Sequence, residues 1–333
     1  MVTTSATEIE PFSTETTAVD ILLCVISVLL CIFICTGNVM TILAILRTEA
    51  LQTFSNVYVA GLAGADFLVG VSLILLALFM IPYLRLTLYF EHINLCVFMQ
   101  GIVIGMIFTS VEHLCLISVE RYLYIVKPYV YHRVMTKRVI ATTMVIAWVL
   151  GVVYSVSPQF IYKPYGEVPL CDVTAVLPIE YLLYSNTAIY SIVIFVIIIM
   201  YVQILKMAFQ QRNAIRAVTV VVAANGHNAK KAEEEAAKTR QATMKSIKFF
   251  LTVFGAYFVC ITPMAICICL DFFFNVNAWV YRFFNLVALT NSGMNFIIYS
   301  VQNRNFRYAF LRMIPCLSAR RYPTSPVTTS ASK

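Results

Sequence analysis

A few ionisable side chains stand in or beside long apolar runs, where a charge is costly. Asp66 is the only carboxylate in the run 56–82, and Glu120 and Arg121 are adjacent at the end of the run 96–120. A charged group inside a bilayer is by default a functional hypothesis. An adjacent acid and arginine can form a charge-assisted hydrogen bond that a partner later breaks. The alternatives are an aspartate that only ties helices together, through a proton or a water, and an arginine that only reaches for the interface.

The remaining candidate groups do not gather into a metal or catalytic site. Glu112 and His113 are adjacent in the middle of the run 96–120, where a pairing with another helix is expected. The histidines fall at four different depths or loops and cannot ligate one metal ion; they are His92, His113, His132 and His227. An intramembrane enzyme would need such a cluster, or a nucleophile beside a base.

Long apolar runs dominate the rest of the chain. Of its 333 residues, 60% are hydrophobic and 12% are charged, and the mean hydropathy is +0.83; a soluble domain carries about 25% charged residues. Runs of roughly 20 apolar residues match the thickness of a bilayer, where each must form a helix. The fold class expected is an all-α membrane protein, a seven-transmembrane helix bundle with a C-terminal amphipathic surface helix. The predicted spans are 21–46, 56–82, 96–120, 139–161, 179–205, 247–270 and 279–301.

The placement of lysine and arginine predicts the orientation. Only Arg85, Lys163 and Arg282 fall on the loops that share a side with the N-terminal tail, and all the others of the 24 basic residues fall on the opposite side. Because basic residues concentrate in the cytosol, the N-terminus is expected outside and the C-terminus inside, in the plasma membrane. The formal charge of +8 then faces anionic lipid rather than nucleic acid.

The predicted organisation has three parts. Residues 1–19 are rich in Thr, Ser and Glu and predict an extracellular disordered tail, and residues 313–333 predict a cytoplasmic disordered tail. Residues 20–312 form the seven-transmembrane domain, with an amphipathic surface helix over 303–312. The inner loop 206–246 is expected to extend a helix into the cytosol, because acidic residues precede basic ones at helical spacing.

The ten cysteines do not form a disulfide framework. Cys96 and Cys171 are predicted at the outer face, where an oxidising exterior permits a disulfide bond between them. Cys316 lies on the inner side and is a candidate for palmitoylation or an ordinary cytosolic thiol. The others lie inside apolar runs, where cysteine acts as a small hydrophobe.

Short motifs occur one to a predicted helix and at matching depth. They are Gly37-Asn38, Leu62-Ala63-Gly64-Ala65-Asp66, Glu120-Arg121-Tyr122, Trp148, Tyr201, Cys260-Ile261-Thr262-Pro263 and Asn291-Ser292…Asn295-Phe296-Ile297-Ile298-Tyr299. Each motif alone is weak, but in this order they form a specific set. Together with Cys96 and Cys171, they resemble the rhodopsin-like (class A) G-protein-coupled receptors over residues 20–312.

The resemblance implies a receptor that passes the binding of an extracellular ligand to a cytosolic heterotrimeric G protein. In that family the arginine that matches Arg121 is held by its acidic neighbour at rest and contacts the Gα subunit when active. Arrestin and a receptor kinase are expected partners of the C-terminal tail. The residues expected in coupling and switching are Glu120, Arg121, Tyr122, Tyr129, Tyr201, Pro263, Asn295 and Tyr299.

The resemblance also implies a sodium ion as an allosteric ligand, with no other metal and no cofactor. Hard cations take oxygen ligands. The matching positions supply a full set, and they are Asp66, Ser110, Asn291, Ser292 and Asn295.

Three residues depart from the pattern of the family. Phe296 replaces the proline of the usual Asn-Pro-x-x-Tyr motif, Val193 replaces the usual proline of the fifth helix, and Ile261 stands at the usual tryptophan switch position. Proline removes a backbone hydrogen bond and so kinks a helix. The departures weaken the transfer of the family's activation route to this chain, and leave the topology intact.

The ligand is expected in the outer third of the bundle, because pockets form between helices. Val103 stands where receptors for biogenic amines have an aspartate, so an amine would lack its counter-ion. No lysine occurs between Lys248 and Lys333, which excludes a retinal Schiff base on the seventh helix. The walls favour a lipid-like or weakly polar molecule, and a peptide at the outer loops stays open. By resemblance the walls are Val103, Ile104, Ile107, Phe108, Met264, Ala265, Ile268 and Asn285.

Two other classes of function stay open on the sequence alone. A transporter or channel would need discontinuous helices, repeats or several ionisable residues along a path, and only Asp66, Glu112 and His113 qualify. Ion flux or hydrolysis in purified vesicles would favour a transporter or an enzyme over a receptor.

Overall fold

The computed structural model describes residues 18–78, 93–161, 173–223, 228–274 and 276–313. Every regular element in these ranges is helical. The N-terminal half contains α1 (Ala18–Arg47), the one-turn helix η1 (Glu49–Leu51), α2 (Phe54–Leu78) and α4 (Ile93–Val126). These are followed by the short α5 (Pro128–Val134) and by α6 (Lys137–Ile161).

The fifth predicted span is one continuous stretch of three helical segments. The short α7 (Val173–Val176) precedes it, and α8 (Ile179–Tyr181), the π-helical η2 (Leu182–Thr187) and α9 (Ala188–Ala223) follow one another without a break. The C-terminal part contains α10 (Asn228–Asp271), α11 (Ala278–Gln302) and α12 (Arg304–Met313).

Six helices in the described ranges are long and apolar enough to cross a membrane. The seventh, α11, has 25 residues and packs against α10, α1 and α2. It is less apolar because it carries three polar residues that are buried in the bundle, Asn291, Ser292 and Asn295. The predicted seven-helix bundle is therefore the fold of the chain.

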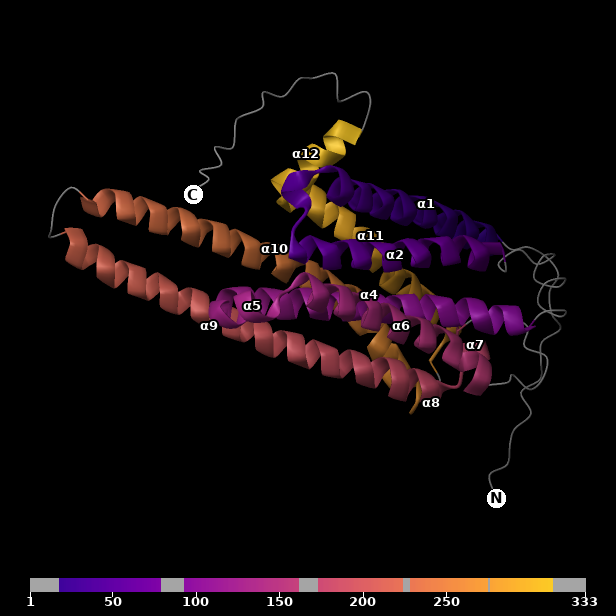
Figure 1. Ribbon diagram of the computed structural model, residues 1–333. Helices are drawn as coiled ribbons and strands as arrows, with labels where there is room; N and C mark the ends of the chain where they lie inside the picture. The colour runs from indigo at the N-terminus through magenta and orange to yellow at the C-terminus, as the bar shows by residue number, and fades with distance from the viewer. Residues whose placement is uncertain (1–17, 79–92, 162–172, 224–227, 275, 314–333) are drawn as a thin grey trace.

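The centre of the bundle is α4, which packs against α2, α6 and α9 (Figure 1). Glycines let α4 and α6 approach closely: a Cβ at Gly105 would overlap Ser155 Oγ, and one at Gly151 would overlap Thr109 Oγ1. Small residues permit such close packing in lipid, where no hydrophobic effect drives helices together.

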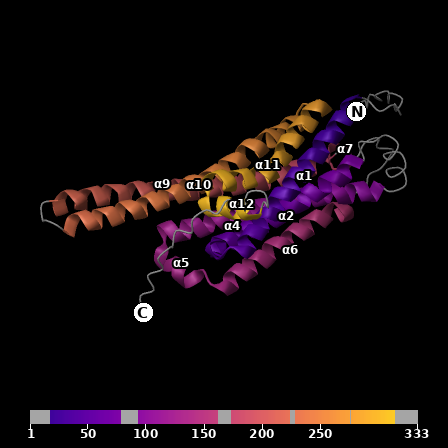
Figure 2. The ribbon, with the colours of Figure 1, turned by 90° about the horizontal axis from the view of Figure 1, so that it is seen from above.

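Two long helices, α9 and α10, continue side by side beyond the bundle (Figures 1 and 2). They cover most of the loop 206–246, so the expected helical extension is confirmed. At the same end of the bundle lie α5 and α12, and α7 lies at the other (Figure 1). We call these the α5 end and the α7 end. The amphipathic α12 buries Phe306, Ala309 and Phe310.

Candidate functional site

A charged cluster lies around Glu120 at the α5 end. The Glu120 side chain is 1% exposed, and its two oxygens accept hydrogen bonds from Arg121, Nε to Oε2 at 2.5 Å and Nη2 to Oε1 at 2.7 Å. The guanidinium also lies over the Tyr124 ring, 5.2 Å from its centroid. Arg121 is thus held by its acidic neighbour in the arrangement that the structure describes.

Two residues that the sequence did not single out complete this cluster. Ser55 Oγ of α2 donates to Glu120 Oε2 at 3.0 Å, and the Tyr131 hydroxyl of α5 donates to Oε1 at 3.1 Å. Burial, and then the negative charge of Glu120, raise the pKa of Tyr131 to about 12, so its hydroxyl stays protonated at neutral pH. Neither residue belongs to a motif, and their contacts arise only when α2, α4 and α5 pack together.

The other tyrosines predicted at the α5 end have different surroundings. Tyr129 is 92% exposed on α5, and Tyr122 is partly buried against the apolar core. Tyr201 is buried and stacks on Phe254, with the ring centroids 5.7 Å apart. Tyr299 stacks instead on Phe306 of α12 at 5.1 Å. The structure therefore places Tyr201 and Tyr299 in separate aromatic clusters.

Pro263 lies inside α10, beside a polar tie to α9. Thr262 Oγ1 donates to the carbonyl of Phe258 at 2.6 Å and lies 2.7 Å from the Tyr190 hydroxyl. Because the threonine hydrogen is already used, Tyr190 is the donor in the second bond. The two helices are thus joined where the proline interrupts the hydrogen bonding of α10.

Asp66 is fully buried among polar groups from three helices. Ser110 Oγ donates to its Oδ1 and Asn295 Nδ2 to its Oδ2, both at 2.8 Å, and Ser292 is a further hydrogen-bond partner. Asn38 of α1 donates to the Ser292 carbonyl at 2.9 Å. One carboxylate and two hydroxyl groups match the oxygen donors that a sodium ion prefers. Asn291, the fifth predicted ligand, is buried on α11 but is not one of the partners of the carboxylate.

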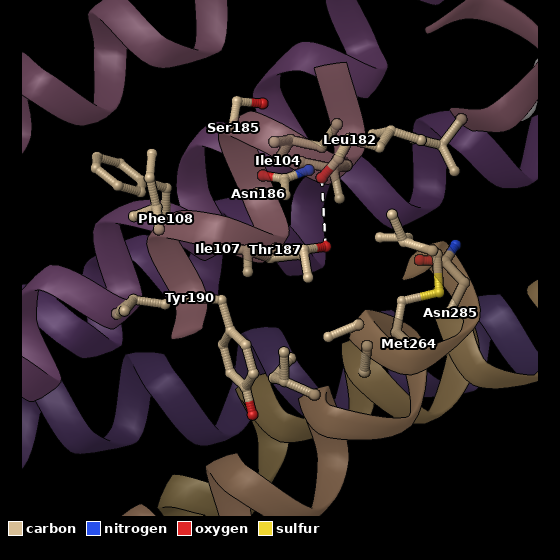
Figure 3. A pocket seen from close by; sticks show the side chains of 18 of the residues that line it. Ile104, Ile107, Phe108, Leu182, Ser185, Asn186, Thr187, Tyr190, Met264 and Asn285 are labelled. Atoms are coloured by element: carbon tan, nitrogen blue, oxygen red, sulfur yellow. Dashed lines mark hydrogen bonds between the residues drawn. The ribbon is translucent and has the colours of Figure 1, made fainter. Parts of the chain in front are cut away.

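A cavity between helices lies toward the α7 end and encloses about 850 Å³, part of it open to solvent. All eight residues predicted to contact a ligand line it, and Figure 3 shows several of them facing one another across the space; they are Val103, Ile104, Ile107, Phe108, Met264, Ala265, Ile268 and Asn285. Their binding role stays a prediction. A mainly apolar cavity between helices with a few polar groups is typical of a site for a small organic molecule.

The π-helical η2 forms a cavity wall that the sequence did not indicate. Thr187 Oγ1 donates to the Leu182 carbonyl, five residues back, at 3.4 Å (Figure 3). Such wider turns are frequent at functional sites. The lining residues absent from the prediction are Gln100, Val111, Val173, Leu182, Ser185, Asn186, Thr187, Ile189, Tyr190, Tyr257, Ile261 and Ala288.

Each of the three departures from the family pattern has a structural counterpart. Ile261 lines the cavity. Val193 lies in the regular part of α9, and the irregular turn of this span is η2 instead. Phe296 packs against Phe33 of α1 and Phe310 of α12, with centroids 6.4 and 4.9 Å away, so it fills the junction of three helices.

The expected pairing of His113 with another helix is a packing contact and not a hydrogen bond. His113 Nδ1 donates to the Thr109 carbonyl of its own helix at 2.7 Å, and its Nε2 and Glu112 Oε2 have no hydrogen-bond partner. The imidazole packs edge-on against Trp148 of α6, at a centroid distance of 6.1 Å. The position is a packing site between helices.

Several predicted features lie outside the described residues, namely Cys171, Cys316 and most of both tails. Cys96 is fully buried in α4. The disulfide bond between Cys96 and Cys171 therefore stays a prediction. Helix α1 begins at Ala18, inside the tail predicted over 1–19, and helix α12 ends at Met313.

The chain is similar to known proteins over most of its length. A family model described as 7 transmembrane receptor (rhodopsin family) matches residues 37–299. Lysophosphatidic acid receptor 3 of Rattus norvegicus is 26% identical, over 95% of this chain and 86% of that protein. Trace amine-associated receptor 8c of Rattus norvegicus is 29% identical, over 82% and 80%. Lysophosphatidic acid receptor 1 of Homo sapiens is 26% identical, over 96% and 82%.

Proposed function

Because the chain belongs to the rhodopsin family of seven-transmembrane receptors, we propose that it transmits the binding of an extracellular ligand to a cytosolic heterotrimeric G protein. As a member of this receptor family it is a multi-pass membrane protein and not an enzyme. The observation that carries the proposal is the presence of two sites on α4. Phe108 lines the cavity and Arg121 is held at the α5 end, which separates them by about 20 Å at 1.5 Å per residue.

Coupling between these sites requires two arrangements of the bundle that a ligand binds with different affinity. In the arrangement described, Arg121 is bound to Glu120 and is withheld from a partner. A swing of α10 about Pro263 would open the α5 end between Arg121, Tyr201 and Tyr299. A G protein that occupies the opening would raise ligand affinity in return, since coupling is reciprocal.

The α5 end is proposed to face the cytosol at the plasma membrane. Exposed basic residues at this end support the orientation, among them Lys137 and Arg138 at the start of α6. The N-terminus and the proposed Cys96–Cys171 disulfide would then be extracellular. The C-terminal tail, with Cys316 as a lipidation site, would meet arrestin and a receptor kinase.

A sodium ion is proposed as an allosteric ligand of the carboxylate of Asp66. The Ser110 hydroxyl already contacts that carboxylate, and Ser292 and Asn295 contact it from α11. Bound sodium would supply a positive charge that compensates a buried acid. The chain's own residues hold α2, α4 and α11 together around it.

The relatives' names mention lysophosphatidic acid, a lipid, and trace amines. The cavity wall favours the lipid-like class over the amine, because Val103 offers no counter-ion and most of the lining is apolar. We therefore propose a small lipid-like ligand.

Guanine-nucleotide exchange is the direct test. Membranes that contain the chain and each class of Gα subunit are exposed to a compound library, and ligand-dependent exchange is expected with at least one class. Arg121→Ala should abolish it at equal surface expression, whereas Arg138→Ala, an exposed arginine at the start of α6, should not. Exchange that survives Arg121→Ala would contradict the assigned role.

A further inference from the structure

The cavity has no fixed charge among the residues of the described ranges that line it. Apart from the hydroxyls of Tyr190 and Tyr257, none of these side chains is ionisable. A charged ligand group would therefore lose its hydration without gaining a counter-ion in a low-dielectric site. Such a burial is strongly unfavourable.

The cavity nevertheless carries two amide groups with unused hydrogen-bonding capacity. Asn186 Oδ1 accepts from the Tyr154 hydroxyl at 2.9 Å, and its NH2 group has no partner among the described residues. Asn285 makes no hydrogen bond within the same part of the chain, and it lines the cavity on α11. The two side chains come from different walls (Figure 3). Both side chains are partly exposed on the cavity wall. Their open hydrogen-bonding groups can therefore meet a ligand that enters the cavity.

The other polar groups of the η2 and α9 wall are already used. Ser185 Oγ donates to the Tyr181 carbonyl, Thr187 Oγ1 to the Leu182 carbonyl, and the Tyr190 hydroxyl to Thr262. Figure 3 shows the Tyr190 hydroxyl pointing away from the labelled residues of η2. Within this wall, Asn186 is therefore the residue whose side chain keeps open donors, and Asn285 adds a second amide from α11.

The orientation of Asn186 is fixed before any ligand binds. Its partner Tyr154 is stacked on Tyr181, with centroids 6.2 Å apart, and packs on Phe108 at 4.7 Å. The π-helical turn carries Asn186 on the cavity wall next to these rings. A preorganised donor contributes more to affinity because less freedom is lost on binding.

We propose that the cavity binds an uncharged amphiphile. Its carbonyl or hydroxyl groups accept a hydrogen bond from Asn186 and exchange hydrogen bonds with Asn285, and its apolar chain packs against Ile104, Ile107 and Met264. Fatty-acid glycerol monoesters and fatty alcohols belong to this class. The inference rests on the proposed function only in taking this cavity as the ligand site.

The test compares three probes that share one alkyl chain: 1-decanoylglycerol, decanoate and decylammonium. Their equilibrium binding to the full chain in lipid nanodiscs is measured without a G protein, and uptake by empty nanodiscs is subtracted. The uncharged probe is expected to bind at least about tenfold more tightly than either ion. Asn186→Leu and Asn285→Leu should each weaken it by about fivefold, the loss expected for one hydrogen bond.

A charge placed in the cavity provides the matched control. Val103→Asp should shift the preference to decylammonium, whereas Val103→Asn should keep the uncharged probe first. Thermal unfolding of each variant verifies that it is folded. If one asparagine variant does not fold, the other is enough for the test.

Two results would overturn the inference. One is that decanoate or decylammonium binds the unmodified chain as tightly as the glycerol ester does. If decanoate binds this tightly and Arg282→Gln removes the binding, Arg282 is the counter-ion and the inference also fails. The other is uptake of the ester that neither asparagine variant changes. Failure of the proposed function gives different results. Selective binding of the ester without nucleotide exchange would contradict G-protein coupling but not this inference. Nucleotide exchange driven only by a charged compound would contradict this inference but not G-protein coupling.

Discussion

Removal of the Tyr131 hydroxyl is expected to raise the activity of the chain in the absence of ligand. This hydroxyl donates to Glu120 Oε1 at 3.1 Å, and the same oxygen accepts from Arg121 Nη2 at 2.7 Å. A hydrogen bond to a charged group contributes about 1.5–3 kcal/mol. Partial exposure of Tyr131 places its contribution at the lower end, about 1.5 kcal/mol. Since about 1.4 kcal/mol changes an equilibrium tenfold, Tyr131→Phe should raise the active population by about tenfold, provided that the bond is made only while Arg121 is held.

Basal GTPγS binding to membranes with co-expressed Gα subunits measures this population, after normalisation to surface expression. Ser55→Ala removes the donor to the other carboxylate oxygen and should act in the same direction, because its hydroxyl contacts Glu120 at 3.0 Å. Tyr184→Phe is the matched control: it deletes the same atom from a tyrosine that is 66% exposed and lies in η2, far along the bundle from Glu120.

Equal basal exchange in Tyr131→Phe and Tyr184→Phe would refute the reasoning, since it would show that the hydroxyl adds nothing to the restraint of Arg121. Lower exchange in Tyr131→Phe at normal expression would also refute it. That result would assign the hydroxyl to the active arrangement.

Three further substitutions test other contacts. Gly105→Val is expected to lower the free energy of unfolding by about 1–3 kcal/mol, because the new side chain overlaps α6. The control Gly255→Ala has nothing within 4 Å of the added Cβ and should be neutral or stabilising by up to about 1 kcal/mol. Equal losses of stability in thermal unfolding would contradict this prediction. Asp66→Asn should abolish any rise in melting temperature when sodium chloride replaces choline chloride, and a rise that persists would exclude the carboxylate as the sodium ligand. Gly37→Ala meets the Phe296 ring, so the double variant with Phe296→Ala should be less destabilised than the sum of the single variants; additivity in a double-mutant cycle would contradict the contact.

The positions of the helices could be predicted because the bilayer fixes the length of an apolar run. The predicted span 139–161 corresponds to Lys137–Ile161, and 279–301 corresponds to Ala278–Gln302. The prediction was short where a helix continues beyond the apolar run: the span predicted over 96–120 belongs to a helix that ends at Val126. A segment inside the bilayer must be helical, but a helix can also continue past the bilayer into water. Hydropathy alone therefore does not locate such helix ends.

The candidate site was predictable only where a residue type is unusual for its depth. Asp66 and Arg121 are conspicuous because a charge near lipid needs a reason. Tyr131 and Asn186 are ordinary for their segments, and their importance comes from partners on other helices. The π-turn at 182–187 was hidden for a related reason. Val193, in place of a proline, predicts a regular helix at that position, but it does not predict the π-helical turn at 182–187.

The isoleucine at position 261 raises the question of which side chain can connect the cavity with the α5 end. Tyr257 lines the cavity and is fully buried, and Phe254 lies three residues earlier in α10, stacked on Tyr201. Tyr201 in turn lies within electrostatic range of Arg121. Tyr257 and Phe254 both lie before Pro263, one turn apart on α10, and the interior is close-packed. A ligand that displaces Tyr257 is therefore expected to disturb the Phe254–Tyr201 stack. The large ring at this depth of the cavity is therefore that of Tyr257, one turn before Ile261 in α10.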